Sequence, residues 1–500
     1  MKTRLATSFI ALSTILATPT LADVSAADVW SNQQALYGSI GATLSGELAD
    51  GQLSNPEINV ILPEGIASFQ IKTDAVSMTD NGDGTVTIEY PSPMTITVAG
   101  GAQGEGSFTA TAEMTHDGYS ITASGEPGDV TYASNGQNLR LEVTDLTLDG
   151  LGLEEFAVEG FVSLTEWVGT SRVTEGNLVT IVSSSEVGSS NADFTFNIEN
   201  VSSRSVQTTQ PMTSQVEGSF PVGGSDVMNL SAALRDGLSL VMKSTGEGNS
   251  SEAETFIDGR LLNRQVTSTG SQTFEATISE DGLTMSGVGS DFAMTMNDPM
   301  IFPADLEFGI ETLSMDYDIP LNASEETQDF RLATGLSGLT IGDTLWNMID
   351  PSAQLPRDPA EISFDVTGMG TNGMDFLDFV ALSQMFGTPP IEIDEVTIEN
   401  LRIAAVGAEA TAQGSMTFDW TDFQTIPGIA RPEGAITVNL NGANGLMDKL
   451  VAMGLIPEDE LMMPRMMMGM FATPVGDDML ETVLEVNSEG HVLANGQRLQ

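Results

Sequence analysis

The feature that most constrains the fold of this chain is an alternation of apolar and polar residues with a period of two, which begins near residue 44. Alternating segments follow Asp-Gly pairs, as Thr85 to Tyr90 follow Asp83-Gly84 and Leu283 to Met285 follow Asp281-Gly282. Such pairs suit the positive φ angles of tight hairpin turns, and an alternating strand has one buried face. Further pairs of this kind are Asp117-Gly118, Asn135-Gly136, Asp236-Gly237 and Asn495-Gly496. The pattern predicts a mainly β fold: an elongated, curved antiparallel sheet built from successive hairpins, with a few covering α-helices.

A weak internal repeat favours the same interpretation. Residues 156–167 resemble residues 410–420, and each segment follows a stretch of alternating aliphatic residues. The spacing is irregular, which argues against a solenoid or propeller of fixed period. Repeated addition of hairpins to one long sheet explains it better.

A short helix is predicted within residues 23–43. Ser25 is a good N-cap, Asp28 completes a capping box three residues later, and Gly41 ends the segment. Val29 and Leu36 lie on one apolar stripe, so we expect this helix to plug one end of the sheet.

The remaining chain is divided into an antiparallel β-sheet region at 44–340 and a C-terminal β region with covering helices at 341–500. Helical pieces are predicted at 343–349, 374–386 and 446–453, followed by a Met-rich segment at 461–471. We expect these helices to cover one face or the ends of the sheet.

The first 22 residues have the pattern of a signal peptide. Lys2 and Arg4 precede an apolar run from Leu5 to Ala17, and small residues surround the expected cleavage site near Ala22. The run is too short to span a bilayer, which takes roughly 20 residues. We therefore expect a periplasmic protein without a transmembrane span after removal of the signal peptide.

Charge and cysteine content exclude several functions. The chain has 17 Lys and Arg residues against 70 Asp and Glu residues, a net charge of −53, so nucleic acid and anionic lipid headgroups are poor partners. It has no cysteine, which excludes thiol catalysis, iron–sulfur clusters and thiolate zinc sites.

No catalytic, cofactor-binding or metal-binding residue can be assigned, and we expect neither a cofactor nor an enzyme. The two histidines, His116 and His491, are interpreted as turn residues, and neither accompanies a nucleophile motif. The segment from Asp80 to Gly84 departs from the calcium-loop pattern, with Gly82 at the third position. A carboxylate pair of a carbohydrate-active enzyme stays open as an alternative, because a sequence does not show the distance between two acids.

A cluster of methionines is the most specific candidate surface. Three interpretations are open: a helix packed on the sheet, an adaptable apolar surface for lipid or peptide, or a soft-metal site, although no His or Cys stands nearby. The residues of this candidate apolar-ligand surface are Met462, Met463, Met466, Met467, Met468, Met470 and Phe471.

Six segments carry a resemblance to a known family: residues 27–30, 346–360, 446–450, 453–455, 465–467 and 494–499. They resemble the alphaproteobacterial "domain of unknown function 2125" proteins. The resemblance implies an exported, mostly β protein with no assigned activity, and it carries over no catalytic residue. The prolines around Arg357 suggest a rigid connector in which Arg357 pairs with an acid or with carbonyl groups.

Together these features favour a non-catalytic exported periplasmic protein. We expect the inner apolar face of a curved sheet, partly gated by the Met-rich segment, to shelter a lipid or an envelope protein. The alternative is an envelope structural or interaction protein with a packed sheet and no ligand. The sequence makes no prediction of the oligomeric state.

Overall fold

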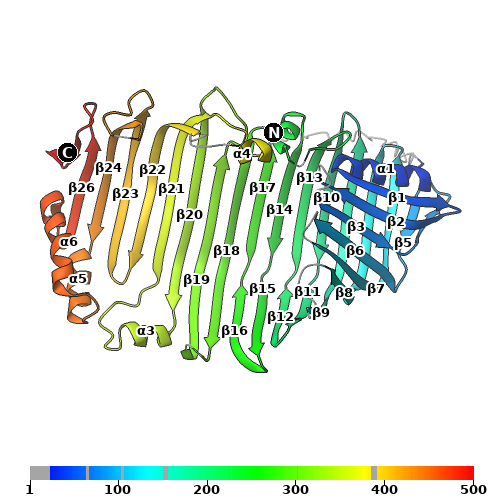
Figure 1. The fold of residues 1–500 in the computed structure, drawn as a ribbon, viewed down its shortest axis with the longest axis horizontal. Helices are drawn as coiled ribbons and strands as arrows, with labels where there is room; N and C mark the ends of the chain where they lie inside the picture. The colour runs from blue at the N-terminus through cyan, green and yellow to red at the C-terminus, as the bar shows by residue number, and fades with distance from the viewer. Residues whose placement is uncertain are drawn as a thin grey trace, which may run out of the picture.

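The computed structural model describes residues 23–62, 67–102, 106–149, 156–226, 228–300, 302–384, 391–426 and 428–499, so the predicted signal peptide lies outside the described residues. The predicted fold class is confirmed: the 28 strands formed by the described residues all belong to one large antiparallel sheet, with a few helices at its margins (Figure 1).

The strands of the first half are β1 (Ala42–Ala49), β2 (Gln52–Ile61), β3 (Ala67–Thr73), β4 (Val76–Asp80), β5 (Val86–Glu89), β6 (Met94–Ala102), β7 (Gly106–Glu126), β8 (Asp129–Asp149), β9 (Ala157–Glu175), β10 (Leu178–Val187), β11 (Ser190–Ile198), β12 (Val201–Thr209) and β13 (Met212–Pro221). The strands of the second half are β14 (Ser239–Gly246), β15 (Asn249–Ile257), β16 (Arg260–Thr269), β17 (Gln272–Ser279), β18 (Gly282–Asp298), β19 (Phe302–Ile319), β20 (Gln328–Ile341), β21 (Ala360–Asn372), β22 (Ile391–Ala405), β23 (Ala408–Asp419), β24 (Arg431–Asn441), β25 (Thr473–Gly476), β26 (Met479–Val486), β27 (Val492–Ala494) and β28 (Gln497–Arg498). The helices are α1 (Ala26–Ser39), α2 (Leu230–Arg235), α3 (Asp343–Ile349), α4 (Phe379–Ser383), α5 (Ala443–Ala452) and α6 (Glu458–Phe471).

The middle of the sheet is a meander of long strands, several of which are interrupted at their centre. β10 and β11 pair with different halves of β9, one after the other. The next strands form half-strand pairs in the same way: β12 with β13, β14 with β15, and β16 with β17. Backbone hydrogen bonds join the strands at these interruptions, for example from Glu247 N to Pro211 O (3.0 Å) and from Gly270 N to Ser290 O (2.8 Å). The interruptions therefore form one seam across the sheet, and each pair of half-strands acts as a single long strand.

The alternation of side chains changes phase where long strands cross the seam. In β18, apolar residues occupy odd positions up to Met285 and even positions from Phe292, and Asp291 between them has a φ of 51°. β8 shows the same change: Asn138 has a φ of 51°, and a Cβ placed on Gly136 would lie 2.8 Å from the Leu139 side chain. Residues 136 and 139 therefore share a face, although strict alternation would put them on opposite faces. The phase change keeps apolar residues on one side along the whole strand.

The first strands form a second layer at the N-terminal end. Here α1 and strands β1 to β3 lie across the strands that follow (Figure 1), while β5 and β6 both pair with β7. The buried core includes Val29 of α1, Met78 of β4, Val130 of β8 and Val173 of β9. The Ser25–Asp28 capping box begins α1, as predicted. The helix thus plugs one end of the sheet, which the sequence also predicted.

Short elements cover the opposite, C-terminal end. Beyond β24 lie β26 and the short strands β25, β27 and β28, with α5 and α6 beside them (Figure 1). A long bare edge strand invites pairing with another chain, and short strands and helices at the edge prevent this.

Some local predictions are wrong. Asp117-Gly118 and Asn135-Gly136 are not hairpin turns but lie opposite each other inside β7 and β8, where the register shifts. The helix predicted at 374–386 is shorter, since α4 covers only Phe379–Ser383 among the described residues. By contrast, Asn495-Gly496 forms the predicted two-residue turn, with φ angles of 48° and 77°.

Candidate functional site: the apolar face of the open sheet

The part of the sheet from β14 to β26 has two chemically different faces. We define the apolar face as the face that carries two rows of paired residues. The first row is Leu313, Leu336, Ile362, Ile403, Ala410, Leu440 and Leu480. The second row is Met242, Ala276, Met285, Tyr317, Leu332, Val366, Ile398, Gly414, Ile436 and Leu484.

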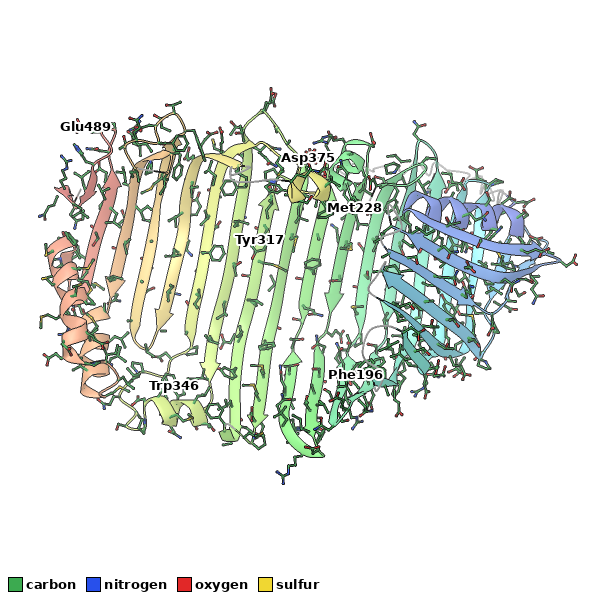
Figure 2. The ribbon with its side chains drawn as sticks, viewed as in Figure 1. Phe196, Met228, Tyr317, Trp346, Asp375 and Glu489 are labelled. Atoms are coloured by element: carbon green, nitrogen blue, oxygen red, sulfur yellow. The ribbon has the colours of Figure 1, made fainter. Side chains whose placement is uncertain are left out.

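The second row crosses ten neighbouring strands without a charged residue. At about 4.8 Å between strands, nine spacings make it about 43 Å long. Tyr317 lies near the middle of this open region (Figure 2). Its neighbours also form a groove of about 480 Å³ in which Gly287 and Gly289 supply bare backbone beside Phe274 and Leu313.

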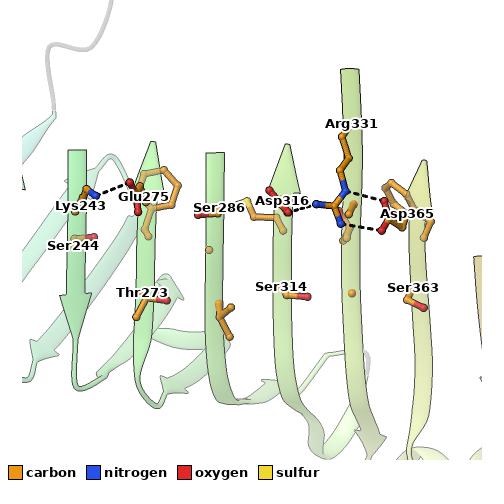
Figure 3. Close-up of a pocket in the computed structure, with 18 of the residues that line it drawn as sticks. Lys243, Ser244, Thr273, Glu275, Ser286, Ser314, Asp316, Arg331, Ser363 and Asp365 are labelled. Atoms are coloured by element: carbon orange, nitrogen blue, oxygen red, sulfur yellow. Dashed lines mark hydrogen bonds and ion pairs between the residues drawn. The ribbon is translucent and has the colours of Figure 1, made fainter. Parts of the chain in front are cut away.

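The opposite side, the polar face, carries charged and hydroxyl side chains at the intervening positions. Lys243 Nζ lies 2.7 Å from Glu275 Oε1, and Arg331 bridges Asp316 (2.5 Å) and Asp365 (2.9 Å), as Figure 3 shows. Small side chains between these pairs leave a groove of about 650 Å³.

The carboxylate pair Asp316 and Asp365 in the polar groove lacks the electrostatics of a glycosidase acid. Hydrogen bonds from Arg331 lower the pKa of the Asp365 carboxyl group, so that group stays ionised near neutral pH. Asp316 shares the same guanidinium. A glycosidase acid instead needs a raised pKa, which makes this carboxylate pair a poor candidate for such an enzyme.

Exposure alone does not distinguish Leu313 on the apolar face from Val288 on the polar face, so the candidate site is defined by the face and by the neighbouring residues. Leu313 on the apolar face and Val288 on the polar face are both 49% exposed, and they belong to adjacent residue pairs of β18 and β19. Leu313 is paired with Leu336 on the next strand, whereas Val288 is paired with Ser314. Leu313 therefore belongs to a continuous apolar surface and Val288 does not.

Two insertions meet at the upper rim of the open sheet, near Met228 and Asp375 in Figure 2. We call residues 228–238 and 373–384 together the rim bridge. Arg235 forms an ion pair with Asp375, and Asn229 Nδ2 donates to Asp378 Oδ2 at 3.0 Å. These contacts fix the loop that holds Phe376 against the upper end of the apolar face.

The predicted Met-rich surface is found on α6, at the C-terminal end of the sheet and not over its middle (Figure 1). Met462, Met463, Met466, Met467 and Met470 are 50–68% exposed, while Met468 and Phe471 are half-buried. Leu461 is the buried contact of this helix, and Arg465 pairs with Asp448 of α5 at 2.6 Å. The methionines are thus neither packed under the sheet nor placed to gate the middle of the apolar face.

The two histidines form local contacts with residues outside the two rows. His116 is inside β7, where its Nδ1 accepts a hydrogen bond from Tyr119 N at 2.9 Å. His491 lies at a turn, with its Nδ1 3.2 Å from Glu489. Within the ranges that the structure describes, no group of three or more His, Cys, Asp or Glu side chains is arranged to hold a metal ion.

Arg357, predicted to pair with an acid or with carbonyl groups, lies 3.2 Å from Asp343 and over the Trp346 ring at the lower rim. These contacts tie the segment after α3 to that helix and are structural. In the described part of the chain, no helix combines the length and the apolar composition that crossing a membrane requires.

Comparison with known proteins gives no relative from which a site could be transferred. No protein-family model matches the chain, and no curated protein and no solved structure is significantly similar to it. The resemblance to the domain of unknown function 2125 proteins therefore stays a prediction.

Sequence reasoning predicted an apolar inner face but did not identify the residues that form it. The signal was present in segments such as Leu283-Thr-Met285 and Leu313-Ser-Met315. Assigning them to one face needs the strand register, and it also needs the phase change at Asp291, which alternation alone does not reveal.

Proposed function

We propose that this protein is a non-catalytic periplasmic protein that binds lipid acyl chains on the apolar face of its open sheet. The observation that carries the proposal is the pairing of apolar residues across ten strands, with a charged and hydroxyl-rich face behind them. A contiguous apolar surface of this extent marks an interaction site in a folded protein.

The shape and charge of the protein support a lipid as the ligand. The second row is about 43 Å long, roughly three times the 15 Å that one acyl chain spans in half of a 30 Å hydrocarbon core. With a net charge of −53, the protein repels anionic headgroups, so neutral or zwitterionic lipids are the expected ligands.

The test is lipid retention by protein purified from the periplasm without detergent, measured by mass spectrometry of an organic extract. Leu313→Asp places a charge in the first row, and we expect it to lower the lipid content at least about tenfold because a carboxylate would lie against the acyl chain. Val288→Asp is the matched control, with the same exposure on the opposite face, and should retain lipid.

Equal lipid content in the two variants, or a wild-type protein that folds and carries no lipid, contradicts the proposal. Circular dichroism of both variants checks that each is folded.

A second candidate function is docking of a protein partner through α6. The five methionines that α6 exposes are the specific observation that favours it. A lipid-free wild-type protein would direct attention to this function, tested by cross-linking from α6 with a variant in which Met466 and Met467 are changed to Asp.

A further inference from the structure

We propose that the apolar pocket under the rim bridge binds the methyl end of a single unbranched alkyl chain, while the headgroup of the lipid stays outside the pocket. This inference rests on the proposed function and assigns the end of the ligand to a specific place. The pocket has a volume of about 240 Å³ and lies at the upper ends of β19 to β22. Its apolar lining residues are Ile319, Phe330, Leu332, Phe376, Ile391 and Ile393.

One wall of the pocket is bare backbone. Gly370 of β21 lines it, and a Cβ there would lie 2.4 Å from the Glu392 carbonyl oxygen of the paired strand β22. A side chain at this position would clash with that backbone, so this part of the wall is limited to glycine.

The cap of the pocket is held by hydrogen bonds. Phe376 N donates to Leu321 O at 2.9 Å, and Asp375 accepts from Ala323 N at 2.8 Å while pairing with Arg235. The Phe376 ring is thus fixed over the pocket by the rim bridge and by the loop after β19.

The chemistry of the lining favours an alkyl end over a polar headgroup. Among the described residues, no charged side chain lines the pocket. The Asn372 amide is already engaged, since its Nδ2 donates to Asn322 O and its Oδ1 accepts from Met374 N. A hydroxyl or a charged group brought into this space would lose its water without gaining a partner from these groups.

Size and position agree with this assignment. At about 30 Å³ for each water-sized group, the pocket holds roughly eight methylene groups. Leu332 belongs both to the pocket and to the second row, so a chain lying along the apolar face leads directly into the pocket. The rest of the lipid would then extend over the open sheet.

The experiment measures binding of lysophosphatidylcholine with a twelve-carbon chain, below its micelle concentration, by isothermal titration calorimetry. We expect an otherwise identical lipid with a hydroxyl on the terminal carbon to bind at least about tenfold more weakly. That hydroxyl would lose its water, and the acceptor beside the pocket that is unpartnered among the described residues, Gln328 Oε1, is covered by neighbouring protein atoms. Equal or tighter binding of the hydroxylated lipid overturns the proposal. The Gln328 Oε1, which is buried beside the pocket without a hydrogen-bond partner among the described residues, would then be the group that accepts from it.

A matched pair of variants separates this proposal from the proposed function. Ile391→Trp fills the pocket and should weaken binding about tenfold, whereas Val288→Trp lies on the polar face, outside both the pocket and the apolar face, and should change it less than about twofold. Both residues are partly exposed, so both variants should fold. If Leu313→Asp abolishes lipid retention but Ile391→Trp does not weaken binding, the pocket assignment is wrong and the apolar face is still the binding surface. If neither variant has an effect, both proposals are wrong.

Discussion

The two ends of the sheet use the same alternation of residues for different purposes. At the N-terminal end, α1 and strands β1 to β3 cover the apolar side, and Val29, Val86 and Val130 are completely buried. From β14 onward, none of the described strands forms a second layer over the apolar side, and Leu313 and Ile403 stay nearly half exposed. Alternation therefore decides which side is apolar, and the presence of a cover decides whether that side becomes a core or a surface.

The comparison also separates stability from binding. A fully buried aliphatic side chain contributes about 1.5–3 kcal/mol to folding, and such residues gather at the closed end. Half-exposed residues of the open region contribute less to folding, so they can be specialised for a ligand. Three changes test this division.

The largest effect is expected from a charge in the closed core. Val29→Asp should lower the free energy of unfolding of the N-terminal end by at least about 4 kcal/mol, because α1 would bury an unpaired carboxylate. Ile403→Asp on the open face should cost less than about 1 kcal/mol. Urea denaturation combined with hydrogen exchange of the α1 and β8 amides measures both values. Similar losses for the two variants would show that the open face is also part of the core.

An intermediate effect is expected from the polar anchor of α1. Asn32 is completely buried; its Nδ2 donates to Glu175 Oε1 at 2.8 Å, and its Oδ1 accepts from Tyr132 Oη at 2.8 Å. Asn32→Leu should cost about 2–3 kcal/mol in urea denaturation, because the Glu175 carboxylate of β9 and the Tyr132 hydroxyl of β8 each lose a hydrogen bond. The Tyr132 hydroxyl keeps only its longer bond to Val29 O, at 3.4 Å. Gln34→Leu, on the exposed side of the same helix, is the control and should change stability by less than about 0.5 kcal/mol. An Asn32→Leu variant with unchanged stability in urea denaturation would mean that the helix is held by apolar contacts alone.

The smallest effect concerns the pH dependence of the open region. Arg331 lowers the pKa of Asp365 in the folded protein, so the pair contributes stability above about pH 4, and that contribution is lost as the pH falls through the folded pKa. Because both side chains are partly exposed, the contribution should be below about 1 kcal/mol. Asp365→Asn should therefore flatten the acid limb of urea-midpoint measurements between pH 2.5 and 6, whereas Ser363→Ala should leave it unchanged. An unchanged acid limb in Asp365→Asn would assign acid sensitivity to other groups.

Local signals in the sequence predicted the parts of the fold that depend on a few neighbouring residues. The capping box of Ser25 and Asp28 and the turn at Asn495-Gly496 are such cases, because each is completed within five residues. Asp117-Gly118 shows the limit of this reasoning. The same dipeptide serves as a turn or as an irregularity inside a long strand, and the choice depends on pairing with β8.

The candidate site was less predictable because it depends on partners far apart in the chain. Met242 and Leu484 belong to one row, yet 241 residues separate them between β14 and β26. The Met cluster was visible in the sequence, but its place at the end of the sheet follows from the order of the strands. The pocket under the rim bridge depends in addition on the contact between α2 and α4 segments, which no local pattern indicates.

From β18 to β24, each strand pairs with the strand that follows it in the chain, while separate elements cover the two ends. Inserting or removing one hairpin in this stretch would change the width of the sheet by two strands, or about 10 Å, and leave both ends intact. The number of hairpins therefore sets the length of the apolar face across the strands, and this length can be increased or decreased by one hairpin at a time.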